Sequence, residues 1–244
     1  MSPRVTAATA QRVLTQLLRD RRTVALLLIV PSVLMVLLRY VFDDRTLFDR
    51  LAPSLLGVFP FVIMFLITSV AMLRERTSGT LERLLTTPLG KLDLLLGYGI
   101  AFAIAAAAQA VVTCGTTYWL LGLDTNGPVW LVVVVAVAGA VLGMAMGLWV
   151  SAFARSEFQA VQFMPAVVLP QLLLCGLFNP RQAMAGWLEW ISNVLPMSYA
   201  VDALTEVSAR ADITGTLVRD LGVVVGAAVV ALVLAAATLR RRTA

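Results

Sequence analysis

Residues 125–154 read TNGPVWLVVVVAVAGAVLGMAMGLWVSAFA, a stretch of 30 residues without Asp, Glu, Lys or Arg. An α-helix rises 1.5 Å per residue, so about 20 of these residues are enough to cross the hydrocarbon core of a bilayer. A strand of a membrane barrel would alternate polar and apolar side chains, and the run VVVVAV at 132–137 does not alternate. This stretch therefore predicts a membrane-spanning helix.

The rest of the chain repeats this pattern. Hydrophobic residues make up 60% of the 244 positions and charged residues 14%, and the mean hydropathy is +0.90. These values exclude a water-soluble globular enzyme and predict an all-α integral membrane protein with a single domain over residues 1–244. Six runs without charge place the expected spans at about 23–42, 51–73, 94–121, 129–153, 158–178 and 221–239.

Basic residues predict the orientation of these spans. With a cytoplasmic N-terminus, the inside segments (1–22, 74–93, 154–157 and 240–244) hold 13 Lys and Arg and the outside segments 6. Because Lys and Arg concentrate in cytoplasmic loops, we expect both termini to be cytoplasmic. The dispersed basic residues favour membrane lipid as a partner, with the arginines at 240–242 near anionic headgroups, and argue against nucleic acid.

A helix is expected before the first span, over residues 8–22. Ala10, Val13, Leu14, Leu17 and Leu18 recur at the spacing of one helical face, and polar residues lie opposite them. We expect an amphipathic helix in the cytoplasmic interface. The alternative is a helix that packs against a neighbouring part of the protein.

The cytoplasmic stretch at 74–93 is more patterned than a linker. The residues at 78–80 can cap a short helix, the leucines at 81, 84 and 85 share one face of it, and Pro88 limits it to about two turns. An exposed apolar face of this kind needs a partner, either another protein or the membrane interface itself.

Two later segments depart from plain apolar helices. The fifth run contains Pro165 and Pro170 together with several Gln side chains, which is typical of a helix near a transport path or of an ordinary kinked helix. Residues 179–220 contain two amphipathic runs separated by Pro196, and we expect them to form external helices that dip back toward the outer leaflet. The glycines at 139, 143 and 147 predict close helix packing.

Several kinds of chemistry are missing from the chain. It has no His, its two Cys lie in predicted spans, and it lacks the phosphate-binding motif GxxxxGK[ST]. Apart from Arg39, which can reach the interface from the end of the first span, the predicted spans contain no charged residue, which argues against a proton-coupled carrier. We therefore expect no catalytic site, bound metal or cofactor in this chain, and ATP-driven transport would need ATP and Mg²⁺ on a separate subunit.

The loop at 74–93 resembles the signature between the second and third spans of ABC-2 type permeases, the membrane subunits of bacterial ABC exporters of the daunorubicin-resistance and polysaccharide-export types. The segment with Leu195, Pro196, Tyr199 and Asp202 before the last span resembles the same family. The loop residues that carry the resemblance are Arg74, Glu75, Arg76, Gly79, Thr80, Leu81, Glu82, Leu84, Thr87 and Pro88.

The resemblance implies an exporter in the bacterial cytoplasmic membrane, in which two permease chains work with two ATPase subunits and the loop residues couple them. Its cargo would be a hydrophobic or amphipathic compound such as a drug, a lipid or a glycolipid. The family plan also implies that the second and fifth spans line the pathway. Candidate lining residues are Phe61, Phe65, Thr68, Gln162 and Gln171.

Two other functions compete with this one. The chain could be an assembly subunit that anchors a cytoplasmic partner without transporting any compound. It could also be an intramembrane enzyme that acts on lipid, for which Glu189, Asp202 and Glu206 are the available carboxylates, although we expect these to cap helices and face headgroups.

Overall fold

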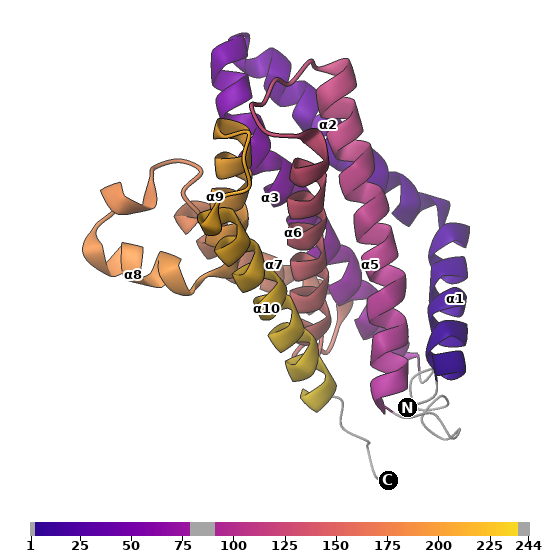
Figure 1. Ribbon diagram of the computed structural model, residues 1–244. Helices are drawn as coiled ribbons and strands as arrows, with labels where there is room; N and C mark the ends of the chain where they lie inside the picture. Colours follow the sequence, from indigo (N-terminus) through magenta and orange to yellow (C-terminus); the bar gives the residue numbers. More distant parts are fainter. Residues whose placement is uncertain (1–2, 79–90, 239–244) are drawn as a thin grey trace.

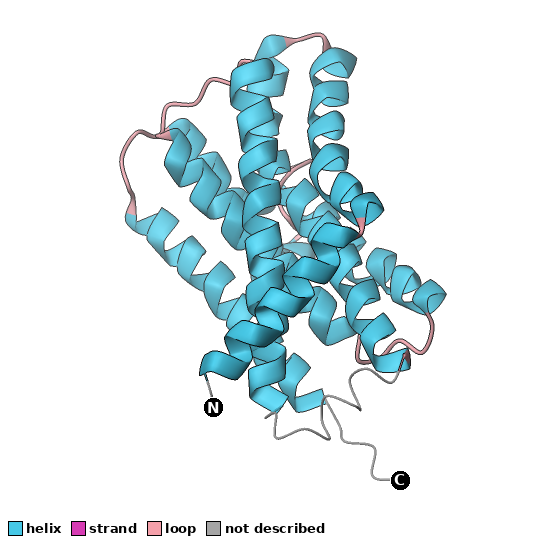
Figure 2. Cartoon of the chain, turned by 90° about the vertical axis from the view of Figure 1, so that its right-hand side faces the viewer, coloured by secondary structure: helices cyan, strands magenta, loops and turns pink. Residues whose placement is uncertain are grey.

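The computed structural model describes residues 3–78 and 91–238, and within these ranges every regular element is a helix (Figure 2). Six helices are long and apolar enough to cross a membrane, which confirms the expectation of an all-α integral membrane protein. The elements are α1 (Pro3–Arg19), α2 (Arg21–Phe42), α3 (Arg45–Thr77), α5 (Lys91–Gly115), a π-helical turn (Thr116–Leu120), α6 (Val129–Val150), α7 (Glu157–Leu174), the 3₁₀ turn η2 (Arg181–Ala183), α8 (Gly186–Val194), α9 (Pro196–Ala209) and α10 (Gly215–Thr238).

Two aspartates decide where the first spans begin. Asp20 accepts hydrogen bonds from the backbone N–H groups of Arg22 and Thr23, so α1 ends at Arg19 and the predicted helix over 8–22 is divided there. Asp44 caps α3 in the same way, which starts this helix at 45 instead of 51. At its other end α3 continues to 77, past the predicted end at 73. The residues predicted to open the cytoplasmic loop therefore belong to a helix.

The last two spans also differ from their predicted bounds. Gly176 has a φ of +92°, a conformation that favours glycine, and α7 ends at 174 instead of 178. The Thr214 hydroxyl accepts a hydrogen bond from the N–H of Leu217, and α10 begins at 215 instead of 221. Arg219 and Asp220, which the prediction placed before the last span, therefore belong to the second turn of the sixth apolar helix.

Helices α3 and α6 form the centre of the molecule (Figure 1). Gly143 and Gly147 of α6 lie directly against the carbonyl groups of Phe61 and Phe65 of α3, where a Cβ atom would overlap the backbone. This contact confirms that the glycine repeat serves close packing of two helices. These two helices therefore form the centre on which the other helices pack.

The N-terminal helix α1 stands beside the first half of α5 (Figure 1). Its Thr9 packs on Gly97 of α5, and Ala10 and Val13 are buried between the two helices. Leu18 is 62% exposed, so the apolar face is covered only in part. The amphipathic pattern of α1 is used for packing on a neighbouring helix, and its location at the membrane interface stays a prediction.

The segment before the last span contains two short helices, as expected. Pro196 opens α9 directly after α8, which separates the two amphipathic runs where the sequence predicted. Figure 1 shows α8 on the side of the bundle away from α1, well below the upper ends of α3 and α5. We call α8 and α9 together the hairpin; its position on the external side stays a prediction.

Candidate functional site

Three consecutive side chains at the end of α3 reach three different neighbours. Arg74 forms two hydrogen bonds with Glu157 at the start of α7, at 2.7 and 3.0 Å. Arg76 donates to the carbonyl oxygen of Ser151 at the end of α6, at 3.0 Å. Because successive residues of a helix point about 100° apart, one turn is enough to contact several helices. We call Arg74, Glu75 and Arg76 the α3 hub.

The third hub residue, Glu75, faces α1 and α5. Its Oε1 lies 3.7 Å from the guanidinium of Arg12, and Arg12 also donates to the hydroxyl of Tyr98 at 2.6 Å. The side chain of Glu75 is 16% exposed and that of Arg12 32%, so water competes only in part for these groups. The hub therefore connects the end of α3 to α1, α5, α6 and α7.

The predicted coupling residues divide into two groups. Arg74, Glu75 and Arg76 form the hub, at the point where the chain enters the predicted coupling segment. The others, namely Gly79, Thr80, Leu81, Glu82, Leu84, Thr87 and Pro88, lie outside the described residues.

The candidate pathway residues occupy two environments. Phe61, Phe65 and Thr68 are fully buried in the contact between α3 and α6, and the Thr68 hydroxyl donates to the carbonyl oxygen of Met64 at 2.7 Å. Gln171 is buried and Gln162 is exposed, although both belong to α7. The structure explains the first three as packing residues, and the pathway role of all five stays a prediction.

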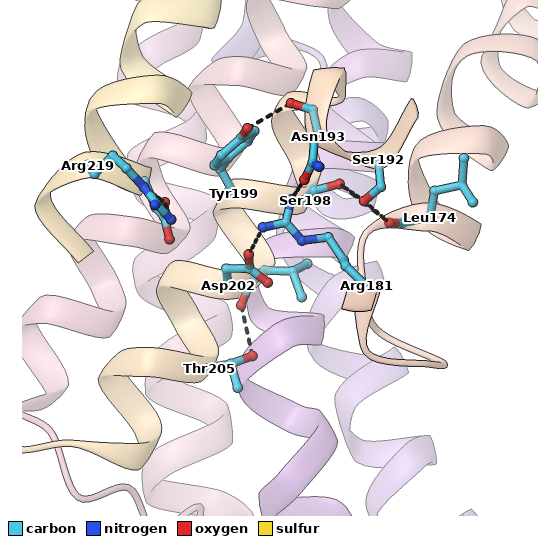
Figure 3. Close-up of polar contacts among 11 residues, drawn as sticks. Leu174, Arg181, Ser192, Asn193, Ser198, Tyr199, Asp202, Thr205 and Arg219 are labelled. Atoms are coloured by element: carbon cyan, nitrogen blue, oxygen red, sulfur yellow. Dashed lines mark hydrogen bonds and ion pairs between the residues drawn. The ribbon is translucent and has the colours of Figure 1, made fainter. Parts of the chain in front are cut away.

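A second polar cluster holds the hairpin together, and Arg181 of η2 is at its centre (Figure 3). The Arg181 guanidinium donates to Asn193 of α8 at 3.1 Å and pairs with Asp202 of α9. It also lies 5.1 Å from the ring centroid of Tyr199, within the range of a cation–π contact. The Arg181 side chain is only 9% exposed, so these three contacts replace its hydration.

Hydroxyl groups attach this cluster to the end of α7. Ser192 donates to the carbonyl oxygen of Leu174 at 2.7 Å and lies 3.1 Å from the hydroxyl of Ser198 (Figure 3). The Tyr199 hydroxyl donates to the carbonyl oxygen of Asn193 at 2.7 Å. We call the six residues Arg181, Ser192, Asn193, Ser198, Tyr199 and Asp202 the hairpin cluster.

The carboxylates considered for lipid chemistry have partners of their own. Asp202 pairs with Arg181, and Glu206 pairs with Arg210 one turn further along α9, at 2.9 Å. Glu189 lies in the first turn of α8, where the positive end of the helix dipole stabilises its negative charge. The expected capping role therefore fits Glu189 alone, because Asp202 and Glu206 lie inside α9 and form ion pairs. That the three carboxylates face lipid headgroups stays a prediction.

Sequence reasoning missed the partners that complete both clusters. Arg12 and Tyr98 are 86 residues apart in the chain, and Arg181 was counted only as an external basic residue. Asp220 carried a usable signal, because it lies at helical spacing between Leu217 and Val224. A buried carboxylate in that apolar series could have been noticed if the last span had been extended toward the N-terminus.

The sequence of this chain is similar to those of known membrane transport proteins. A family model described as ABC-2 type transporter matches residues 4–208. Similar proteins include the probable multidrug ABC transporter permease YbhR of Escherichia coli, 25% identical over 64% of this chain and 42% of that protein. The linearmycin resistance permease protein LnrN of Bacillus subtilis is 25% identical over 66% of this chain and 42% of its own length.

A third similar protein comes from Dictyostelium discoideum. ABC transporter G family member 20 of Dictyostelium discoideum is 28% identical over 66% of this chain, which corresponds to 22% of that protein. The matched region thus spans less than half of each of these three relatives.

Proposed function

Because this chain belongs to the ABC-2 type transporter family, we propose that it is the permease subunit of an ATP-driven exporter in a bacterial cytoplasmic membrane. In this proposal a separate ATPase binds ATP and Mg²⁺, two ATPase subunits serve two permease chains, and both termini of the permease are cytoplasmic. The cargo is a hydrophobic or amphipathic compound. The words multidrug and linearmycin resistance in the names of two relatives support this class of cargo.

The observation that carries the proposal is the α3 hub. An ATPase that pulls on the segment after α3 needs a mechanical connection to the spans, since a short loop would otherwise move alone. Arg74 leads to α7, Arg76 to α6, and Glu75 to α1 and α5 through Arg12. A displacement at this point therefore reaches four helices at once.

The contact between Arg74 of the hub and Glu157 is also suited to repeated rearrangement. The side chains of Arg74 and Glu157 are 60% and 52% exposed, and exposed ion pairs contribute only about 0–1 kcal/mol each. Such contacts break and form again at little cost. We infer that the hub transmits movement during each cycle of ATP hydrolysis, and that α3 moves together with its neighbours.

The decisive experiment tests the coupling segment with Leu81→Asp in the full chain, expressed with its ATPase and reconstituted in lipid vesicles. The three leucines of this segment contribute only a few kcal/mol when buried, so one charge should prevent their docking. We expect the permease to insert and fold, while the ATPase is lost on purification or its turnover no longer drives transport. The matched control is Gln16→Asp, at an exposed position of α1.

The experiment also distinguishes an exporter from the rival function, an assembly subunit that transports nothing. Wild-type co-purification and transport in Leu81→Asp would show that this segment is not the coupling element. For an assembly subunit, the ATPase would bind the wild-type chain, but ATP turnover would not respond to any transported compound.

A further inference from the structure

A groove of about 610 Å³ lies between α1 and the first half of α5, which stand side by side (Figure 1). Its volume is within the range of about 300–1,000 Å³ that is usual for ligand sites. The described residues that line the groove carry no charge, and most of them are apolar. The apolar lining includes Ala7, Ala10 and Leu14 of α1 and Leu96, Ile100 and Ile104 of α5. The groove is therefore suited to an apolar ligand.

The sequence explains why this groove exists. Leu96, Ile100 and Ile104 recur every four residues, so they form one ridge along α5, and their side chains are 37–49% exposed. The backbone of α1 comes close to α5 because Thr9 packs on Gly97, where an added Cβ atom would lie 2.6 Å from the Cβ of Thr9. Alanines of α1 leave space beside this contact. The apolar ridge thus remains without a protein cover among the described residues.

The segment that forms one wall of the groove is strongly basic. Residues 3–22 contain five Arg, at positions 4, 12, 19, 21 and 22, against one acidic residue, Asp20. Arg12 is held by its contacts to α3 and α5, whereas the arginines at the other four positions are exposed. Arg4 lies two turns before Gln11, which lines the groove, and therefore on the same side of α1. Positive charge thus accompanies the apolar groove along α1.

We propose that the groove binds one acyl chain of an anionic phospholipid, and that the exposed arginines of residues 3–22 hold its headgroup. The acyl chain covers the apolar ridge of α5, while phosphate oxygens accept hydrogen bonds from the guanidinium groups. Because α1 leads directly into the first span, α2, a lipid of the surrounding leaflet can enter the groove from the side. The bound lipid then joins α1 to α5, in addition to the contact of Thr9 with Gly97.

The charges favour an anionic lipid over other occupants of the groove. A symmetric contact between two copies of this chain would bring two arginine-rich segments together, and like charges at an interface repel each other. A zwitterionic headgroup has no net charge to balance the exposed arginines. An anionic headgroup complements them, and each arginine close to an anionic membrane surface strengthens the attraction about fivefold.

The test is photochemical cross-linking of the full chain in lipid nanodiscs that contain a trace of phospholipid with a diazirine in its acyl chain. Phosphatidylglycerol is the anionic probe and phosphatidylcholine the zwitterionic one, and mass spectrometry locates the labelled residues. We expect phosphatidylglycerol to label the groove-lining residues of α1 and α5 about fivefold or more above phosphatidylcholine. The exposed apolar face of α10 should be labelled equally by both probes.

Two substitutions fill the groove and test the site of the acyl chain. Ile100→Trp on α5 and Ala7→Leu on α1 should each reduce the labelling of the groove severalfold. Ala7 is exposed, so Ala7→Leu keeps the test decisive if Ile100→Trp does not fold. The matched control is Val111→Trp, an exposed residue two turns after Ile104 on the same face of α5, which should leave the labelling of the groove unchanged.

A further variant tests the headgroup. Arg4→Gln combined with Arg19→Gln should lower the preference for phosphatidylglycerol about fivefold or more, while labelling by phosphatidylcholine stays the same. The matched control is Arg155→Gln, an exposed arginine of the loop between α6 and α7, which should keep the preference of the wild type.

Equal labelling of the wild-type groove by the two probes would overturn the proposal, as would unchanged labelling in the groove-filling variants or an unchanged preference in the arginine variant. An Ile100→Cys chain that forms a disulfide with a second copy would assign the groove to a contact between chains and would also overturn the proposal. The measurements require neither ATPase nor cargo, so their result is independent of the proposed export function.

Discussion

The α3 hub and the hairpin cluster both connect several helices through arginine, but they differ in depth. In the hub, Arg74 and its partner are more than half exposed, whereas Arg181 of the hairpin cluster is 9% exposed and contacts a carboxylate, an amide and an aromatic ring together. Water can replace the partners of the first arginine and not those of the second. The contact between Arg74 and Glu157 is therefore suited to change, whereas the contacts of the hairpin cluster are suited to persist.

The largest effect on stability is expected when the buried Arg181 is removed, and this substitution is the strongest test of the difference between the two clusters. Arg181→Ala leaves the carboxylate of Asp202 partly buried without its cation, and breaking a buried pair costs about 3–5 kcal/mol. We expect the low end of this range, because Asp202 keeps some contact with water. The free energy of unfolding, measured by denaturant titration in mixed micelles, provides the test.

The matched control for this prediction lies on the same hairpin. Arg210→Ala removes the exposed partner of Glu206 and should cost about 0–1 kcal/mol. Equal losses in the two variants would show that burial does not distinguish the arginines.

An intermediate effect is expected where the hub meets α1. Arg12→Met keeps most of the apolar side chain but loses the contacts to Glu75 and Tyr98, at a cost of about 1–2 kcal/mol. A double-mutant cycle with Glu75→Gln should give a coupling energy of about 0.5 kcal/mol or more, since these residues share one contact network. Strict additivity of the two substitutions would mean that α1 is not tied to α3 through this pair.

The smallest effect is expected at the exposed pair of the hub. Arg74→Gln and Glu157→Gln should each change the free energy of unfolding by about 0–1 kcal/mol, and high salt should reduce the difference from the wild type. ATP-driven transport, in contrast, should fall in both variants if the hub transmits movement. A large loss of stability that is insensitive to salt would show that this pair behaves like the buried contacts of the hairpin cluster.

The amphipathic pattern of α1 shows what can be predicted from local sequence and what cannot. Ala10 and Val13 were correctly predicted to share one face of a helix, because helical spacing is a local property, although this face was expected at the membrane interface and is buried in the protein. The surface that covers this face, which includes Gly97 of α5, is distant in the chain and left no signal in the residues of α1. The same limit applies to Phe61 and Phe65, whose aromatic side chains fit either a pathway or a helix contact.

The residues of α10 show a different limit. The end of the charge-free run at 221 was taken as the start of the last span, although a capped helix can carry charges in its first turns. Thr214 sets the start of this helix, and tertiary packing decides that Asp220 is buried. A prediction that begins the last span after the last charged residue excludes Asp220 from it, whatever surrounds Asp220 in the folded protein.

The sequence by itself determined the number of spans, their helical form and the division of the hairpin at Pro196, because the thickness of a bilayer and the geometry of proline act on consecutive residues. Only the tertiary structure decided which polar side chains meet. Arg12 and Tyr98 are 86 residues apart, Arg74 and Glu157 are 83 apart, and Arg181 and Asp202 belong to different elements. Such pairings depend on how helices pack on one another, which no local pattern records.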